Sequence, residues 1–183
     1  MNKRKFVSLL LIVSILSLCL IGCGKKSDSK QVGKWAYIHD TETAVLILKE
    51  DCSAIFKGKS YSFEDDGSYL TLKASNEELK MKYEMVNGDM YLYETNVYTY
   101  VGDGTPDGLV GVWRNAPNKW EFEFTDKGTF KEDTYFPGYY TVNEENSSIK
   151  LVYNDHFEDT IILYSINGNE LTIQYPWRMV RMD

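Results

Sequence analysis

Strict alternation of apolar and charged residues is the sequence feature that most constrains the fold of this 183-residue chain. In residues 79–85 and 120–124 every second residue is apolar, and the residues between them are Lys or Glu. This period places one face of a strand in a core and the other in water, as in an antiparallel sheet. A helix starting after Ser75 is the alternative for the first run, because a capping residue precedes two acids there. The alternation downstream favours a strand and predicts an all-β protein.

Segments of the first half recur in the second half at offsets of 76 to 80 residues. Gly33-Lys34-Trp35 returns as Gly111-Val112-Trp113, and the Asn-Gly pair at Asn87 returns at Asn167, where each pair is typical of a type I′ hairpin turn. Loop-sized drift of the offset indicates two copies of one unit. We therefore predict two compact antiparallel β-barrel or sandwich domains, 33–101 and 111–183, joined by a Gly- and Asp-rich linker, 102–110.

The recurring motifs are similar to those of a known family. A Gly-x-Trp start, an apolar strand ending at an Asp-x-Gly turn, a Gly-Tyr-Tyr strand and an Arg-rich last strand resemble the small lipocalin-like domains common in bacterial lipoproteins. The resemblance implies that Trp35 and Trp113 are structural and that Arg181 of the last strand lies against Trp113. In the first copy, the position matching Arg181 is Val101. The resemblance implies no ligand.

The N-terminal segment indicates export. Three basic residues, 3–5, precede an apolar run, 6–21, that is too short to cross a bilayer, which needs about 20 residues. The following Leu20-Ile21-Gly22-Cys23 resembles the lipobox of bacterial lipoproteins, in which the cysteine receives a diacylglycerol and becomes the new N-terminus. We predict a signal peptide over 1–22 and a lipidated Cys23 on a tether over 23–32. An ordinary signal peptide with an incidental cysteine and an uncleaved anchor are the alternatives.

Removal of residues 1–22 leaves 17 Lys and Arg against 27 Asp and Glu, a net charge of −10. Such a charge repels phosphate backbones and anionic headgroups, which argues against nucleic acid and electrostatic membrane binding. The membrane partner is therefore expected through the lipid anchor, on the extracytoplasmic face of the cell membrane. Because Cys19 leaves with the signal, we expect Cys52 to be the single cysteine of the folded part, with no internal disulfide.

Motifs for catalysis, cofactors or metals are not found. His39 and His156 lack a neighbouring histidine or cysteine at metal-ligand spacing, so no metal is predicted. Glu121 and Glu123 share a strand face at about 7 Å, a spacing discussed for paired-carboxylate hydrolysis, but any solvated strand face has this pattern. We predict a non-catalytic binding or interaction module without cofactors. A cell-envelope hydrolase with an unrecognised site, or a carrier of a small apolar ligand, is the alternative.

Aromatic residues beside prolines are the candidate binding surface. Tyr135, Phe136 and Tyr139 surround one turn, and Trp177 follows Pro176 at another. Prolines cannot pair fully in a ladder, so neighbouring rings are expected to face outward, where they suit protein, peptide or glycan partners. The alternative is that these rings fill a small core. The barrel interiors themselves are expected to be filled by side chains.

Overall fold

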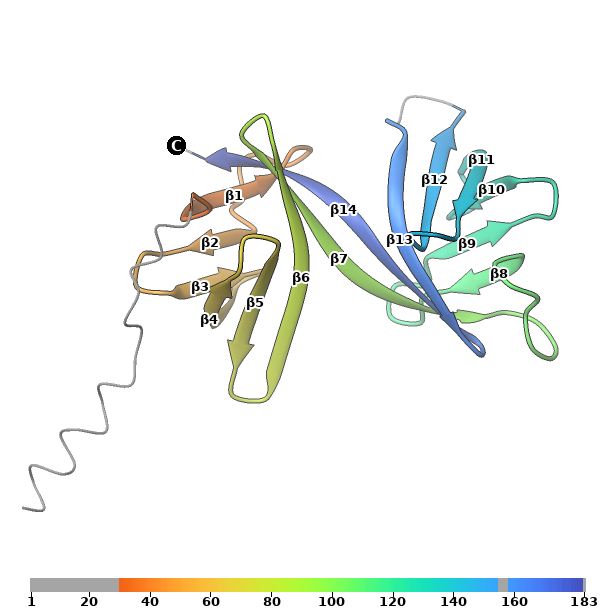
Figure 1. Cartoon of the computed structure of the whole chain (residues 1–183), viewed down its shortest axis with the longest axis horizontal. Helices are drawn as coiled ribbons and strands as arrows, with labels where there is room; N and C mark the ends of the chain where they lie inside the picture. The colour runs from red at the N-terminus through yellow and green to blue at the C-terminus, as the bar shows by residue number, and fades with distance from the viewer. Residues whose placement is uncertain (1–29, 155–157, 183) are drawn as a thin grey trace, which may run out of the picture.

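The computed structural model describes residues 30–154 and 158–182, which form strands and turns and contain no helix (Figure 1). The all-β prediction is thereby confirmed. The fourteen strands are β1 (Gly33–Tyr37), β2 (Leu46–Leu48), β3 (Ser53–Phe56), β4 (Lys59–Asp65), β5 (Tyr69–Ala74), β6 (Glu77–Val86), β7 (Asp89–Tyr100), β8 (Gly111–Arg114), β9 (Glu121–Phe124), β10 (Thr129–Glu132), β11 (Phe136–Asn143), β12 (Ser148–Tyr153), β13 (Thr160–Asn167) and β14 (Glu170–Met182).

The strands form one closed ring in which each pairs antiparallel with its neighbours in sequence, and β14 returns to β1. An additional pairing joins β7 to β14 across the ring, from Met90 opposite Met179 to Thr99 opposite Glu170. These two long strands run diagonally between two groups of shorter strands (Figure 1). The ring is thus divided into a first lobe, containing β1–β6, and a second lobe, containing β8–β13, and both lobes use β7 and β14.

Each lobe has its own hydrophobic core. Trp35, Leu46 and Leu72 are fully buried in the first core, and Trp113, Phe122 and Leu151 are buried in the second. The cores do not follow the chain strictly, because β7 and β14 each pass from one lobe to the other. Met179 of β14 therefore packs in the first core, and Tyr98 of β7 packs in the second.

The Gly-x-Trp motif lies where each lobe is closed by the strand that comes from the other half of the chain. Arg181 pairs with Trp35, and its guanidinium lies 4.6 Å from the centroid of the indole. At the matching place Tyr100 pairs with Trp113, with ring centroids 5.4 Å apart. The expected contact between Arg181 and Trp113 is therefore wrong, because β14 extends along β7 until its last residues reach β1. The residue matching Arg181 is Tyr100 rather than Val101.

The glycines of these motifs are required by the close approach of the capping side chains. Gly33 has a φ of +146°, and a Cβ atom there would lie 2.6 Å from Nη1 of Arg181. Gly111 has a φ of +133°, and a Cβ atom there would lie 2.5 Å from Cε2 of Tyr100. Glycine at these two positions therefore allows Arg181 to cover Trp35 and Tyr100 to cover Trp113.

The turns and strand ends confirm some local predictions and correct others. Residues 77–86 form β6, as the alternation predicts, and Asn87 and Gly88 both have positive φ, as in a type I′ turn. Asn167 does not have a positive φ, because it is the last residue of β13. The turn that follows begins at Gly168, whose φ is +58°. Trp120 lies outside β9 and is 37% exposed, so the inward alternation there begins only at Phe122.

Cys52, in the turn before β3, is half-buried and disulfide-bonded. Residues 30–154 and 158–182 contain no second cysteine, so this bond is not internal to the folded part. Cys19 and Cys23, the other cysteines of the chain, lie outside those residues. The predicted signal peptide, the lipidation site Cys23 and most of the tether also lie outside the described residues. Within the described part of the chain, no helix is long and apolar enough to cross a membrane.

Candidate functional site

A pocket of about 210 Å³ opens in the second lobe beside the paired strands β7 and β14. Its wall is mainly aromatic, its rim contains three asparagines, and a single carboxylate reaches it. The lining residues are Asn96 and Tyr98 from β7, Asn115, Asn118 and Trp120 from the β8–β9 connection, Phe122 from β9, Glu132 from β10, and Ile173, Tyr175 and Trp177 from β14.

Glu132 points inward because it continues the alternation of β10, in which Phe130 is buried and Lys131 is exposed. Its Oε2 accepts a hydrogen bond of 2.5 Å from the Tyr153 hydroxyl, and its Oε1 accepts one of 3.0 Å from Nε1 of Trp120. Within residues 30–154 and 158–182, no Lys or Arg forms an ion pair with this carboxylate. Burial raises the pKa of Glu132, and the two hydrogen bonds only oppose that shift.

Three tyrosines surround the carboxyl group. Burial, and then the charge of Glu132, raise the pKa values of Tyr98 and Tyr153 well above the ordinary range for tyrosine. Burial also raises the pKa of Tyr175. All three phenols therefore keep their protons at neutral pH. Tyr98 and Tyr175 line the pocket as neutral groups, and Tyr153 contacts it through its hydrogen bond to Glu132.

The first lobe has an apolar residue at the position of Glu132. Phe122 pairs with Glu132 in the second lobe, and its counterpart Leu46 pairs with Phe56 in the first. Phe56 is 7% exposed and belongs to the first core. The second lobe therefore places an ionisable group where the same architecture accepts a buried phenylalanine. Comparison of the sequences of the two lobes along this alternation is the signal that could identify Glu132 from sequence.

The structure does not bring the predicted aromatic surface together as one site. Tyr135 is 77% exposed and Tyr139 is 59% exposed, whereas Phe136 is half-buried. Trp177 is also half-buried and packs instead against Tyr37 and Tyr175, with ring centroids 5.6 and 4.9 Å apart. It thus lines the pocket beside β14, while Tyr139 lines a separate groove.

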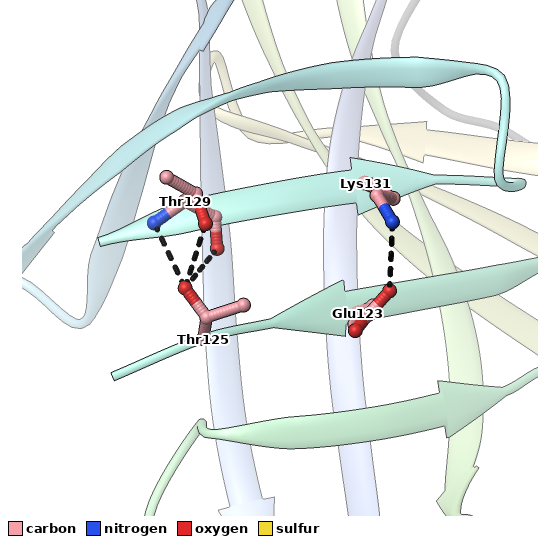
Figure 2. A network of polar contacts seen from close by, with 4 residues as sticks. All are labelled: Glu123, Thr125, Thr129 and Lys131. Atoms are coloured by element: carbon pink, nitrogen blue, oxygen red, sulfur yellow. Dashed lines mark hydrogen bonds and ion pairs between the residues drawn. The ribbon is translucent and has the colours of Figure 1, made fainter. Parts of the chain in front are cut away.

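The groove beside Tyr139 has a volume of about 270 Å³ and lies over β9, β10 and β11. Its polar side chains satisfy one another (Figure 2): the hydroxyls of Thr125 and Thr129 lie 2.7 Å apart, and Nζ of Lys131 lies 3.6 Å from Oε2 of Glu123. Because these polar groups already bind one another, the groove offers a ligand weaker polar interactions than the Glu132 carboxylate, which has no ion-pair partner among the described residues.

The other candidate residues are structural or lie elsewhere. Glu121 and Glu123 form separate ion pairs with Arg114 and Lys131, so they do not act as a pair. His39 stacks on Tyr37, with ring centroids 5.4 Å apart, and His156 lies outside the described residues. Among the described residues, no group of three His, Cys, Asp or Glu side chains is arranged to hold a metal ion.

Comparisons with family models, with curated proteins and with solved structures find no match for this chain. The lipocalin-like resemblance therefore stays a prediction. The pocket at Glu132 is the feature of the described structure on which a functional proposal is built.

Proposed function

We propose that this protein is a lipid-anchored, extracytoplasmic binding module without catalytic activity, built from two tandem lipocalin-like β units. Its ligand occupies the pocket of the second lobe. The observation that supports this assignment is Glu132, a half-buried carboxylate without a cationic partner in the described residues, at an opening lined by aromatic rings. Leaving a charge in such a place destabilises a fold, so a ligand that compensates the charge explains it best.

Matching contacts in the two lobes support the tandem units. Nε1 of Trp35 donates a hydrogen bond to the carbonyl four residues earlier, at Gln31, and Nε1 of Trp113 does the same to Leu109. Glu94 and Tyr175 are opposite each other in the β7–β14 pairing. Beyond this pair, Tyr100 near the end of β7 and Arg181 near the end of β14 occupy equivalent positions in the two lobes. Two copies of one unit that exchange the ends of their last strands account for this symmetry.

The chemistry around Glu132 favours binding over hydrolysis. A paired-carboxylate mechanism needs a second carboxyl group about 5–10 Å away in the same cleft. The side chains that line this pocket with Glu132 are aromatic residues, asparagines and an isoleucine. Because the neighbouring tyrosines keep their protons, they are suited to orient a ligand rather than to attack it.

A thermal-shift screen tests the proposed function. The detergent-solubilised full-length protein is scanned with small amines, amino acids, monosaccharides and carboxylates, next to an Asn96→Trp variant that fills the pocket. The control is Val97→Trp, because Val97 is the next residue of β7 and is 46% exposed. We expect one chemical class to raise the Tm of the parent and of Val97→Trp but not that of Asn96→Trp. No shift with any class, or equal shifts in all three proteins, would contradict the proposal.

A further inference from the structure

We propose that the pocket at Glu132 binds a small organic cation, with an alkylammonium group held between the Glu132 carboxylate and the aromatic wall. This inference rests on the proposed function of the same pocket and adds the chemical class of its ligand. Charge complementarity is the first reason. The carboxylate has two neutral hydrogen-bond donors, Tyr153 and Trp120, and among the described residues it has no positive side chain to balance it.

The aromatic wall is the second reason. Rings of Tyr98, Trp120, Tyr175 and Trp177 line the pocket together with the carboxylate. The face of an aromatic ring attracts a cation within about 6 Å of its centroid, most strongly for Trp, and desolvated sites of this kind recognise quaternary ammonium groups. A wall of rings beside one carboxylate thus favours a weakly hydrated organic cation over an anion or a sugar.

The first lobe contains the arrangement that the second lobe leaves incomplete. The carboxylate of Glu94, whose side chain is 12% exposed, forms an ion pair with Nζ of Lys57 and accepts a hydrogen bond from the Tyr37 hydroxyl. Nζ of Lys57 also lies 5.2 Å from the centroid of the Phe56 ring. There the chain itself supplies an alkylammonium group to a carboxylate, a phenol and a ring. In the second lobe, the carboxylate, phenol and rings are present and the ammonium group has to come from a ligand.

A metal cation fits the pocket poorly. Ca²⁺ takes six to eight oxygen ligands and Mg²⁺ requires an octahedral set, whereas Glu132 is the single carboxylate in the lining. Nδ2 of Asn115 donates 2.9 Å to the Val97 carbonyl, and its Oδ1 accepts 3.2 Å from the Asn118 amide, so that side chain is already engaged in the rim. Asn96 and Asn118 remain as amides that can bind a hydroxyl or carbonyl of the ligand.

The size of the pocket limits the ligand. Its volume of about 210 Å³ is below the ~300–1,000 Å³ typical of sites for drug-sized ligands. An alkylammonium group with a short polar arm, of the size of choline, suits this volume. The same chemistry occurs in free amines and in lipid headgroups, and the small volume favours the free molecule.

Calorimetric titration with choline and with its uncharged isostere, 3,3-dimethylbutan-1-ol, tests the charge requirement. We expect choline to bind the detergent-solubilised full-length protein at least about tenfold more tightly than the alcohol. Glu132→Gln keeps the shape of the side chain and removes its charge, and should weaken choline binding by a similar factor. Glu123→Gln is the matched control, because Glu123 lies on the adjacent strand in the separate outer groove, and it should bind choline as the parent does.

The pH dependence gives an independent reading. Choline binding should weaken as the pH falls and Glu132 becomes protonated, and this loss should be absent in Glu132→Gln. The other titratable groups facing Glu132 are Tyr98, Tyr153 and Tyr175, which are neutral, and Asp133, whose charge raises the pKa of Glu132 further. Trp120→Leu, a change at a partly exposed ring, should also weaken binding and provides a second variant if Glu132→Gln folds poorly.

The outcomes separate the two proposals. Equal affinity for choline and the alcohol, or unchanged choline binding by Glu132→Gln, would overturn the cation inference. If another chemical class in the screen raises the Tm of the parent but not that of Asn96→Trp, the proposed binding function stands without the cation inference. Phosphatidylcholine vesicles added as a competitor distinguish the sources of the ammonium group: competition at matched headgroup concentration would contradict a free amine as ligand, and no competition would support it.

Discussion

At the scale of single residues, Glu132 is an ionisable side chain at a position where the first lobe has the buried Phe56. Its pKa is raised by burial, so the folded protein binds this proton more tightly than the unfolded chain does. Stability from such a group is present below the unfolded pKa of about 4.3 and is lost as the pH rises through the folded value. Where Glu132 is ionised and no ligand is bound, its charge therefore destabilises the folded protein.

We predict that Glu132→Gln raises the Tm at pH 7 by roughly 2–4 °C, corresponding to about 1 kcal/mol in a protein of this size. The gain should shrink toward zero near pH 4, where the parent side chain is protonated too. Thermal melts at both pH values measure the difference, with Glu123→Gln as the exposed counterpart. A Tm below that of the parent at pH 7 would show instead that the carboxylate stabilises the fold through Tyr153 and Trp120.

At the scale of strands, β7 and β14 determine the architecture. The last residues of β14 pair with β1 on one side and with the start of β7 on the other, so they complete the first lobe from the far end of the chain. The first residues of β14 pair with β13 and with the end of β7, in the second lobe. One strand thus closes two cores.

Deleting residues 177–183 should remove the ladder between β14 and β1 that closes the first lobe, while the ladders between strands of the second lobe remain. We expect amide hydrogen exchange in β1 to accelerate strongly, because β1 loses its ladder with β14. Amides of β11 and β12, which pair with each other far from the deletion in sequence, serve as the internal control. Unchanged protection in β1 would contradict the strand exchange.

Local features of these strands were predictable from sequence, and their partners were not. Alternation identifies β6, and Asn87-Gly88 identifies its turn, because both depend on neighbouring residues. The contact of Arg181 with Trp35 depends on the register of two strands 146 residues apart, which no local period encodes. The same applies to the site: Glu132 continues a visible alternation, but the rings that surround it come from β7, β12 and β14.

At the scale of the whole molecule, the shared strands couple the two cores. Trp113 is fully buried, and Trp113→Ala should destabilise the protein by ~3–5 kcal/mol, as large aromatic truncations in cores do. Because β7 and β14 belong to both lobes, we expect calorimetry to show a single transition that moves down as a unit. Trp120→Ala, at a 37% exposed ring, should shift it much less. Two separate transitions in the Trp113→Ala protein would contradict coupled lobes.

The proposed lipid anchor also concerns the whole molecule, because it would place the pocket at the membrane surface. With a net charge of −10 after removal of residues 1–22, the folded part is expected to be repelled by anionic headgroups, so the proposed attachment depends on acyl chains at Cys23. Two such chains supply on the order of 20 kcal/mol at ~0.8 kcal/mol per buried CH₂ group, enough for stable anchoring without a basic patch.

Cys23→Ser should therefore release the protein from membranes or leave an unprocessed precursor, as membrane fractionation and intact mass measure. Cys52→Ser is the matched control: it removes the other cysteine of the predicted mature chain and keeps Cys23, whose thiol the lipobox pattern assigns to lipid. Its membrane recovery and acyl mass should equal those of the parent. Unchanged processing and membrane recovery in Cys23→Ser would show that the segment over residues 1–22 is an ordinary signal or an uncleaved anchor, since neither needs a thiol at position 23.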